Sequence, residues 1–82
     1  MSKRELLEDE MIVFESPEYD DAIIGTTHDG RVVYDFEKMC DCLVKEGMTE
    51  EEAGEFIEYN AVRAIPYAGQ YAPVVMYPIE GE

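Results

Sequence analysis

The first half of the chain alternates short hydrophobic runs with polar turns, a pattern typical of β-strands. Residues 22–27 (AIIGTT) and 31–35 (RVVYD) are rich in β-branched side chains, and HDG (28–30) separates them. Asp-Gly between two such runs is a strong hairpin signal, because glycine adopts a positive φ without strain. The pattern predicts a β-hairpin over residues 22–35.

The residues before the hairpin contain one hydrophobic run, MIVF (11–14). We interpret it either as a short strand or as a plug that packs on the core. Residues 15–21 (ESPEYDD) are acidic and contain a proline, which favours a loop. Residues 1–10 carry charges of both signs, and we expect them to form a frayed helical turn or to stay disordered.

A helical period begins directly after the hairpin. Asp35 stands at an N-cap position, and apolar side chains recur behind it at three- and four-residue steps. This stripe comprises Phe36, Met39, Cys40, Leu43 and Val44. Gly47 follows where helices commonly end in a left-handed residue. The pattern predicts a helix over residues 36–46.

A second helix is predicted to start almost at once. Thr49 and Glu52 have the spacing of a capping box, while Met48 precedes the cap at the position of a hydrophobic staple with Ala53. The predicted buried stripe consists of Ala53, Phe56, Ile57, Asn60, Ala61 and Ala64. Pro66 disfavours helical backbone at the residue before it, so this helix is expected to end by about residue 64.

The last part of the chain is uncharged from residue 64 to residue 79, although 32% of all residues are charged. Residues 66–73 (PYAGQYAP) predict a turn-rich connector, and 72–79 (APVVMYPI) predict a strand. A proline near each end of that run favours an edge strand or a strand with short pairing. Residues 80–82 form a polar tail.

This order of elements predicts one small α+β domain over residues 1–82. The N-terminal β-hairpin and the C-terminal strand would form a small antiparallel or mixed sheet, packed on a two-helix hairpin. A chain of 82 residues can bury one small core but not two.

Charge adds the most unusual feature, because 20 acidic residues outnumber 6 Lys and Arg and give a formal net charge of −14. Direct binding to nucleic acid is disfavoured, since phosphate contacts depend on Lys and Arg. A basic protein partner fits this charge better, above all one whose site normally holds nucleic acid. The alternative is that acidity only keeps the chain soluble.

Two groups of residues are candidate partner-binding sites. The acidic group, a mimic of phosphate charge, comprises Glu50, Glu51, Glu55 and Glu58 on the second helix and Asp20 and Asp21 before the hairpin. The second group lies where this helix meets the uncharged segment, and comprises Tyr59, Asn60, Arg63, Tyr67 and Tyr71.

The second group has two interpretations. Its members could form a small polar pocket in which tyrosines, together with Tyr77, supply anchoring contacts. Alternatively, Asn60 ties the helix to a neighbouring loop, while Arg63 holds the carbonyls at the helix end or stacks on a tyrosine.

Catalytic and metal-binding patterns are absent from the sequence. His28 is the only histidine, and it lies at the predicted hairpin tip. Cys40 and Cys42 would point about 200° apart on a helix, so we expect free thiols in a reducing cytoplasm rather than a disulfide. No run is apolar enough for a membrane span or a signal peptide. We therefore expect a non-enzymatic cytoplasmic protein without cofactor or metal.

Two long segments carry a resemblance. YDDAIIGTTHDGRVVYDFEKM and MTEEEAGEFIEYNAVRAIPYAGQYAPVVMYP contain G-x-[TV]-x-DGR-VVYD, YN-x-x-[RG]-A-x-PY-x-G and AP-x-x patterns. Over nearly its whole length the chain resembles a family of small, acidic, uncharacterised bacteriophage and prophage proteins. The resemblance implies a phage product in a bacterial cytoplasm, where small acidic proteins often inhibit host defence, as some anti-CRISPR proteins do.

These observations give a leading hypothesis and an alternative. The chain would bind a host protein, such as a nuclease or CRISPR effector, with acidic faces steering the association. The alternative is an assembly module that forms a homodimer through pairing of its uncharged C-terminal strand.

Overall fold

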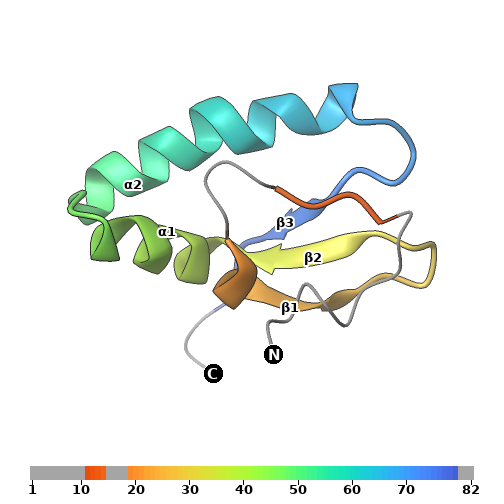
Figure 1. Cartoon of the computed structure of the whole chain (residues 1–82), viewed down its shortest axis with the longest axis horizontal. Coiled ribbons are helices and arrows are strands. Elements are labelled where there is room, and N and C mark those ends of the chain that lie inside the picture. Colours follow the sequence, from red (N-terminus) through yellow and green to blue (C-terminus); the bar gives the residue numbers. More distant parts are fainter. Residues whose placement is uncertain (1–10, 15–18, 80–82) are drawn as a thin grey trace.

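The computed structural model of the chain describes residues 11–14 and 19–79. The expectations for residues 1–10, for most of the acidic loop and for the tail 80–82 lie outside the described residues. Within them, the chain has the predicted α+β fold, with a three-stranded sheet and two helices (Figure 1).

The sheet is mixed and has the order β1-β2-β3. Strands β1 (Ile23–Thr26) and β2 (Val32–Asp35) form the predicted antiparallel hairpin, with a bulge between Ile23 and Gly25. Strand β3 (Val74–Met76) pairs in parallel with β2 and lies at the edge of the sheet, as its flanking prolines predict. The central strand β2 is therefore paired on both sides.

The hairpin turn is held by local hydrogen bonds. The Gly30 N–H donates to the Thr27 carbonyl over 3.1 Å, and Gly30 has a φ of +88°. The Thr27 hydroxyl donates to the Asp29 carboxylate and accepts from the Arg31 N–H. The bond from Thr27 lowers the pKa of Asp29 below its usual value. Glycine supplies the left-handed backbone that the Asp-Gly signal predicts.

Helix α1 (Phe36–Lys45) follows β2 without a connecting loop. The carboxylate of Asp35, the last residue of β2, accepts hydrogen bonds from the N–H groups of Glu37 (2.9 Å) and Lys38 (3.2 Å). Asp35 is therefore both strand end and N-cap, as the sequence predicts. Gly47, with a φ of +110°, follows the helix end in the left-handed conformation.

Helix α2 (Glu50–Phe56) begins with the predicted capping box, in which Thr49 and Glu52 each accept a backbone N–H bond from the other. It continues as a π-helical turn (Ile57–Ala61) and a 3₁₀ turn (Val62–Tyr67). The prediction that the helix ends by about residue 64 is wrong by about one turn. The fixed φ of Pro66 fits a 3₁₀ turn, which the Ala68 N–H closes by donating to the Ile65 carbonyl.

The π-helical turn also changes which residues face the core. Ala53, Ile57 and Ala61 are buried as predicted, whereas Asn60 and Ala64 are exposed. A π turn holds more residues than an α turn. After Ile57, the position that faces the core therefore comes one residue later than the Asn60 position that a regular α-helix would bury, and Ala61 occupies it. On α1, Met39 and Leu43 are buried, while Val44 is exposed, contrary to prediction.

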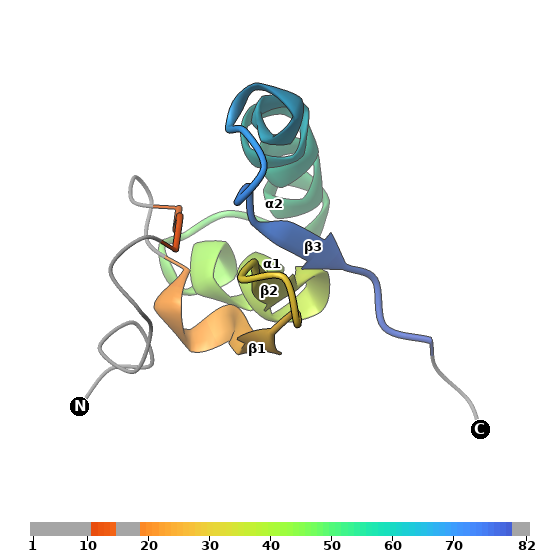
Figure 2. The same ribbon diagram turned by 90° about the vertical axis from the view of Figure 1, so that its right-hand side faces the viewer.

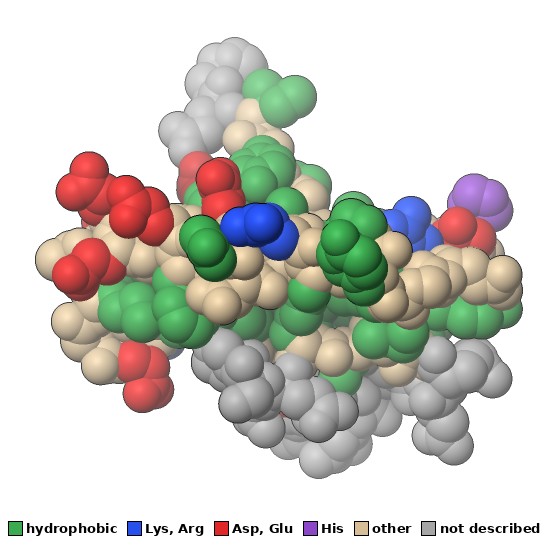
Figure 3. Space-filling view, turned by 90° about the horizontal axis from the view of Figure 1, so that it is seen from above, with side chains coloured by type: hydrophobic (Ala, Val, Ile, Leu, Met, Phe, Trp, Pro, Cys, Tyr) green, Lys and Arg blue, Asp and Glu red, His purple; other side chains and the backbone are tan. Residues whose placement is uncertain are grey.

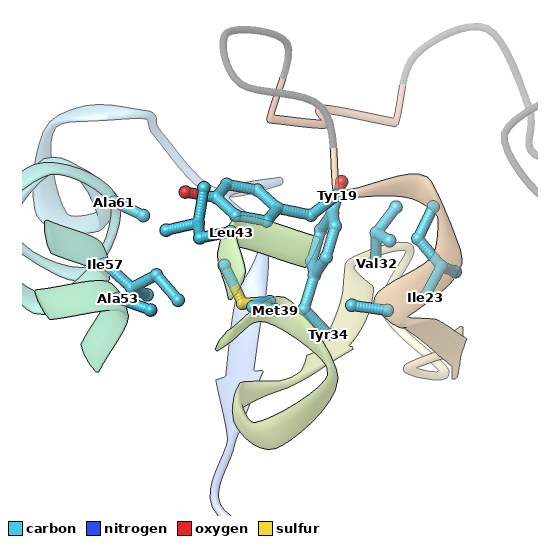
Figure 4. Close-up of a cluster of buried hydrophobic side chains, with 10 residues drawn as sticks. Tyr19, Ile23, Val32, Tyr34, Met39, Leu43, Ala53, Ile57 and Ala61 are labelled. Carbon is cyan, nitrogen blue, oxygen red and sulfur yellow. The ribbon is translucent and has the colours of Figure 1, made fainter. Parts of the chain in front are cut away.

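Helix α1 extends from the end of β2, and α2 with its continuation runs above both α1 and the sheet in the view of Figure 1, as the turned view in Figure 2 also shows. Helix α1 lies between α2 and a 3₁₀ turn (Asp20–Ala22), and contacts both. The core between the helices and the sheet is built around Tyr19, Tyr34, Met39 and Ile57, which are almost fully buried (Figure 4).

The segment 11–14 packs on this core as a plug and forms no strand. The Phe14 ring contacts the rings of Tyr19 and Tyr34, with centroid distances of 6.0 and 4.9 Å. The Phe14 N–H donates to the Tyr34 hydroxyl over 3.1 Å. By contrast, the buried Tyr19 hydroxyl, directed toward α2, has no hydrogen-bond partner among the described residues (Figure 4). Burial raises the pKa of Tyr19 to about 12.

These two tyrosines make a matched pair of hydroxyl deletions. Tyr34→Phe should lower the free energy of unfolding by about 1 kcal/mol, because the partly buried Phe14 N–H loses the Tyr34 hydroxyl as its acceptor. Tyr19→Phe should leave stability unchanged or raise it, because an unpaired polar group leaves the core. Urea unfolding followed by circular dichroism measures both, and a larger loss for Tyr19→Phe than for Tyr34→Phe would contradict the assignment.

A second pair of variants tests the hairpin turn. Gly30→Ala should destabilise the fold by about 1–2 kcal/mol, because a Cβ atom is strained at positive φ. That Cβ would also meet the Tyr71 ring at 3.4 Å. Gly25→Ala in β1 is the control, since its Cβ would meet no atom within 4 Å. Thermal unfolding should separate the two, and equal melting temperatures would refute the role given to Gly30.

Candidate partner-binding surface

An open hollow of about 580 Å³ lies beside α2, and we name it the α2 hollow. Its lining comes from α2, from the π and 3₁₀ turns that continue it, and from the residue after β3. These residues are Glu55, Glu58, Tyr59, Val62, Arg63 and Tyr77. Three residues of the predicted polar and aromatic group are absent from this lining, and two of the predicted glutamates are part of it.

Tyr77 is brought to the hollow by the parallel return of β3. Its ring packs on that of Phe36, the first residue of α1, with centroids 4.7 Å apart and planes inclined by 36°. About half of Tyr77 remains exposed. Burial, and then the charge of Glu58, raise the pKa of Tyr77. The Tyr77 hydroxyl therefore lies close enough to the negative charge of Glu58 to be affected by it.

Arg63 stacks on Tyr59, as one of the two structural interpretations predicts. The guanidinium carbon lies 4.7 Å from the centroid of the Tyr59 ring, within cation–π range. Both side chains are exposed, Tyr59 by 69%. The hollow therefore already holds one guanidinium against an aromatic face.

Asn60 does not belong to the hollow or to the core. Its side-chain amide donates to the Phe56 carbonyl over 3.0 Å, one turn earlier on the same helix. The expected tie to a neighbouring loop is therefore wrong, because the π turn places Asn60 on the exposed side. The amide satisfies a backbone carbonyl of its own helix instead.

Tyr67 and Tyr71 do not line the α2 hollow. Tyr67 is 90% exposed on the 3₁₀ turn. Tyr71 packs over the hairpin turn, where its ring atoms approach Gly30. Nearby, Arg31 Nε donates to the Ala72 carbonyl over 2.8 Å and ties the connector to the hairpin. The predicted group is thus divided between two places.

The acidic residues are divided as well. Glu50, Glu51, Glu55 and Glu58 are exposed on the α2 side. Asp20 and Asp21 belong to the 3₁₀ turn that packs on the other side of α1 (Figure 1).

The pKa values of the two cysteines on α1 reflect this division. Burial is the largest cause that raises the pKa of each thiol. Nearby charges that include Glu50 and Glu58 also raise the pKa of Cys40, whereas Asp21 and Asp20 are among those that raise the pKa of Cys42. Residues two apart on a helix point in nearly opposite directions. The predicted acidic group is therefore two faces and not one.

Figure 3 looks down on α2 and shows that charged and hydrophobic side chains adjoin on this face. Acidic side chains gather at the end near the α1–α2 junction. Hydrophobic and basic side chains are exposed beside them, toward the other end of the molecule. A smaller hollow between the helices extends the acidic surface, with a lining of Phe36, Glu37, Cys40, Asp41, Glu50 and Gly54.

The other candidates for chemistry among the described residues are metal-binding side chains, the histidine and the cysteines. No three His, Cys, Asp or Glu side chains gather as a metal site within 11–14 and 19–79. His28 is exposed at the hairpin turn, and Cys40 and Cys42 are free thiols. In the same part of the chain, no helix has the length and apolarity needed to cross a membrane.

Comparison with known protein families, curated proteins and solved structures finds no match to this chain.

Crowding of like charges on α2 has a measurable cost. Glu55 lies four residues after Glu51 and three before Glu58, and like charges at these spacings repel. Glu55→Gln should therefore raise the free energy of unfolding by about 0.5 kcal/mol in low salt. The gain should vanish in about 1 M NaCl, where charges are screened within about 3 Å. A gain that persists in high salt would show that repulsion is not its cause.

Proposed function

We propose that the chain acts by binding and not by catalysis, as a phage-type protein that engages a host protein in the bacterial cytoplasm. The partner is a basic protein that holds nucleic acid, such as a defence nuclease or CRISPR effector. The chain would occupy its nucleic-acid site and inhibit it.

One observation carries this proposal: carboxylates and half-exposed tyrosines share one surface on the α2 side. Aromatic side chains supply large contact area at protein interfaces, and charge of one sign steers a partner of the other sign. A solvated acidic surface needs no aromatic residues among its charges. The net charge of −14 favours a basic partner and disfavours free nucleic acid.

The test is capture from a bacterial lysate on the immobilised chain, followed by elution with duplex DNA. Proteins that bind through their nucleic-acid site should be released by DNA and by high salt. Glu55→Lys/Glu58→Lys should abolish their capture, whereas Asp20→Lys/Asp21→Lys carries the same charge change on the other acidic face and should retain it. Circular dichroism confirms that both variants fold.

Two outcomes would overturn this proposal. If the wild-type chain retains no protein that DNA releases, the chain does not occupy a nucleic-acid site. If the Asp20 and Asp21 variant loses capture while the Glu55 and Glu58 variant keeps it, the α2 surface is not the binding face.

A second candidate function is homodimer assembly through β3. This strand lies at the edge of the described sheet, and residues 64–79 around it are uncharged. An uncharged edge is the place where two chains of charge −14 could pair with least repulsion. Light scattering distinguishes the two functions, because a monomeric mass excludes assembly.

A further inference from the structure

We propose that the α2 hollow is a binding site for an arginine side chain of the partner, with Arg63 as its intramolecular occupant. This inference rests on the proposed function and specifies the chemistry that the hollow recognises. It follows from the geometry of the lining residues and from their charge.

The lining has the groups that a guanidinium needs. Tyr59 and Tyr77 present aromatic surface, and Glu55 and Glu58 present carboxylates around the same hollow. Both tyrosines are at least half exposed, so their rings are accessible to a partner. A planar guanidinium stacks on an aromatic face while its N–H groups donate to carboxylates.

Arg63 shows that this geometry accepts a guanidinium. It lies 4.7 Å from the centroid of the Tyr59 ring and lines the hollow together with both glutamates. Two carboxylates and one guanidinium leave a net charge of −1 in the lining. An incoming arginine therefore meets a negative site in which Arg63 already covers the Tyr59 ring, and must compete with it.

Arginine fits this site better than lysine. A lysine ammonium is a compact, strongly hydrated charge, and it cannot form the paired, planar contact of a guanidinium. Bidentate pairing with carboxylates gives arginine an advantage over lysine on any acidic surface. The part of the preference that is lost when Tyr59 is replaced therefore measures the contribution of the aromatic surface.

The experiment titrates the full chain with hexaarginine and hexalysine, two peptides of equal charge, by isothermal calorimetry in low salt. Hexaarginine should bind about 3- to 10-fold more tightly than hexalysine. Tyr59→Leu should remove most of this preference and leave hexalysine binding unchanged. Tyr67→Leu is the matched control, since Tyr67 is exposed outside the hollow, and it should keep the preference.

Arg63→Gln gives the sharpest result. If Arg63 competes for the site, this variant should bind hexaarginine about 3-fold or more tightly than the wild type, because the ring is uncovered and a positive charge is gone. Unchanged or weaker binding by Arg63→Gln would show that Arg63 does not compete with the incoming guanidinium, and would overturn the inference.

Equal binding of the two peptides by the wild type would also overturn the arginine site, as would an effect of Tyr67→Leu equal to that of Tyr59→Leu. Neither result touches the proposed function, which the DNA-released capture tests separately. Thermal unfolding of each variant confirms that the fold is retained, and Tyr59 is suited to this test because it lies outside the core.

Discussion

Asp35 is the constraint on which the rest of the structure depends. It pairs with Met76 as the last residue of β2, and its carboxylate caps the first turn of α1. A strand that becomes a helix with no loop between them has one fixed direction of exit. That direction starts α1 at Phe36, and the chain then passes through α2 and returns β3 parallel to β2. Each later element is placed relative to this junction.

The candidate surface follows from the same junction. Because Met76 pairs with Asp35, the next residue, Tyr77, comes to lie against Phe36, the residue that follows Asp35. Tyr77, held in place by this ring contact, lines the α2 hollow together with the glutamates and Arg63 of the long helical segment. In the proposed binding role, charge would attract the partner over a distance and aromatic contact would make the surface selective, since Coulomb attraction alone distinguishes poorly between cations. Within the described residues, no charged side chain is buried in the core, which is built on tyrosine, methionine and isoleucine side chains.

Local signals predicted most of the fold. The hairpin, the Asp35 cap, the Thr49–Glu52 box and the edge position of β3 each depend on a few neighbouring residues, and all four are present. The π turn was not foreseen, because helical period 3.6 was assumed throughout, and this placed Asn60 on the wrong face. The surface was predicted only in part. Glu55, Glu58, Tyr59 and Arg63 recur at three- and four-residue steps along one helical segment. Tyr77 reaches them only through strand pairing, which no local pattern specifies.

The central claim is that partner recognition takes place in the hollow that the Phe36–Tyr77 contact completes. Backbone amide and tyrosine ring resonances, followed by NMR as hexaarginine is added to the full chain, test it most directly. We expect the shifts to concentrate at residues 55–63 and at Tyr77, with little change at Asp20 and Asp21. Shifts centred on Asp20 and Asp21, or spread evenly over all acidic residues, would contradict it.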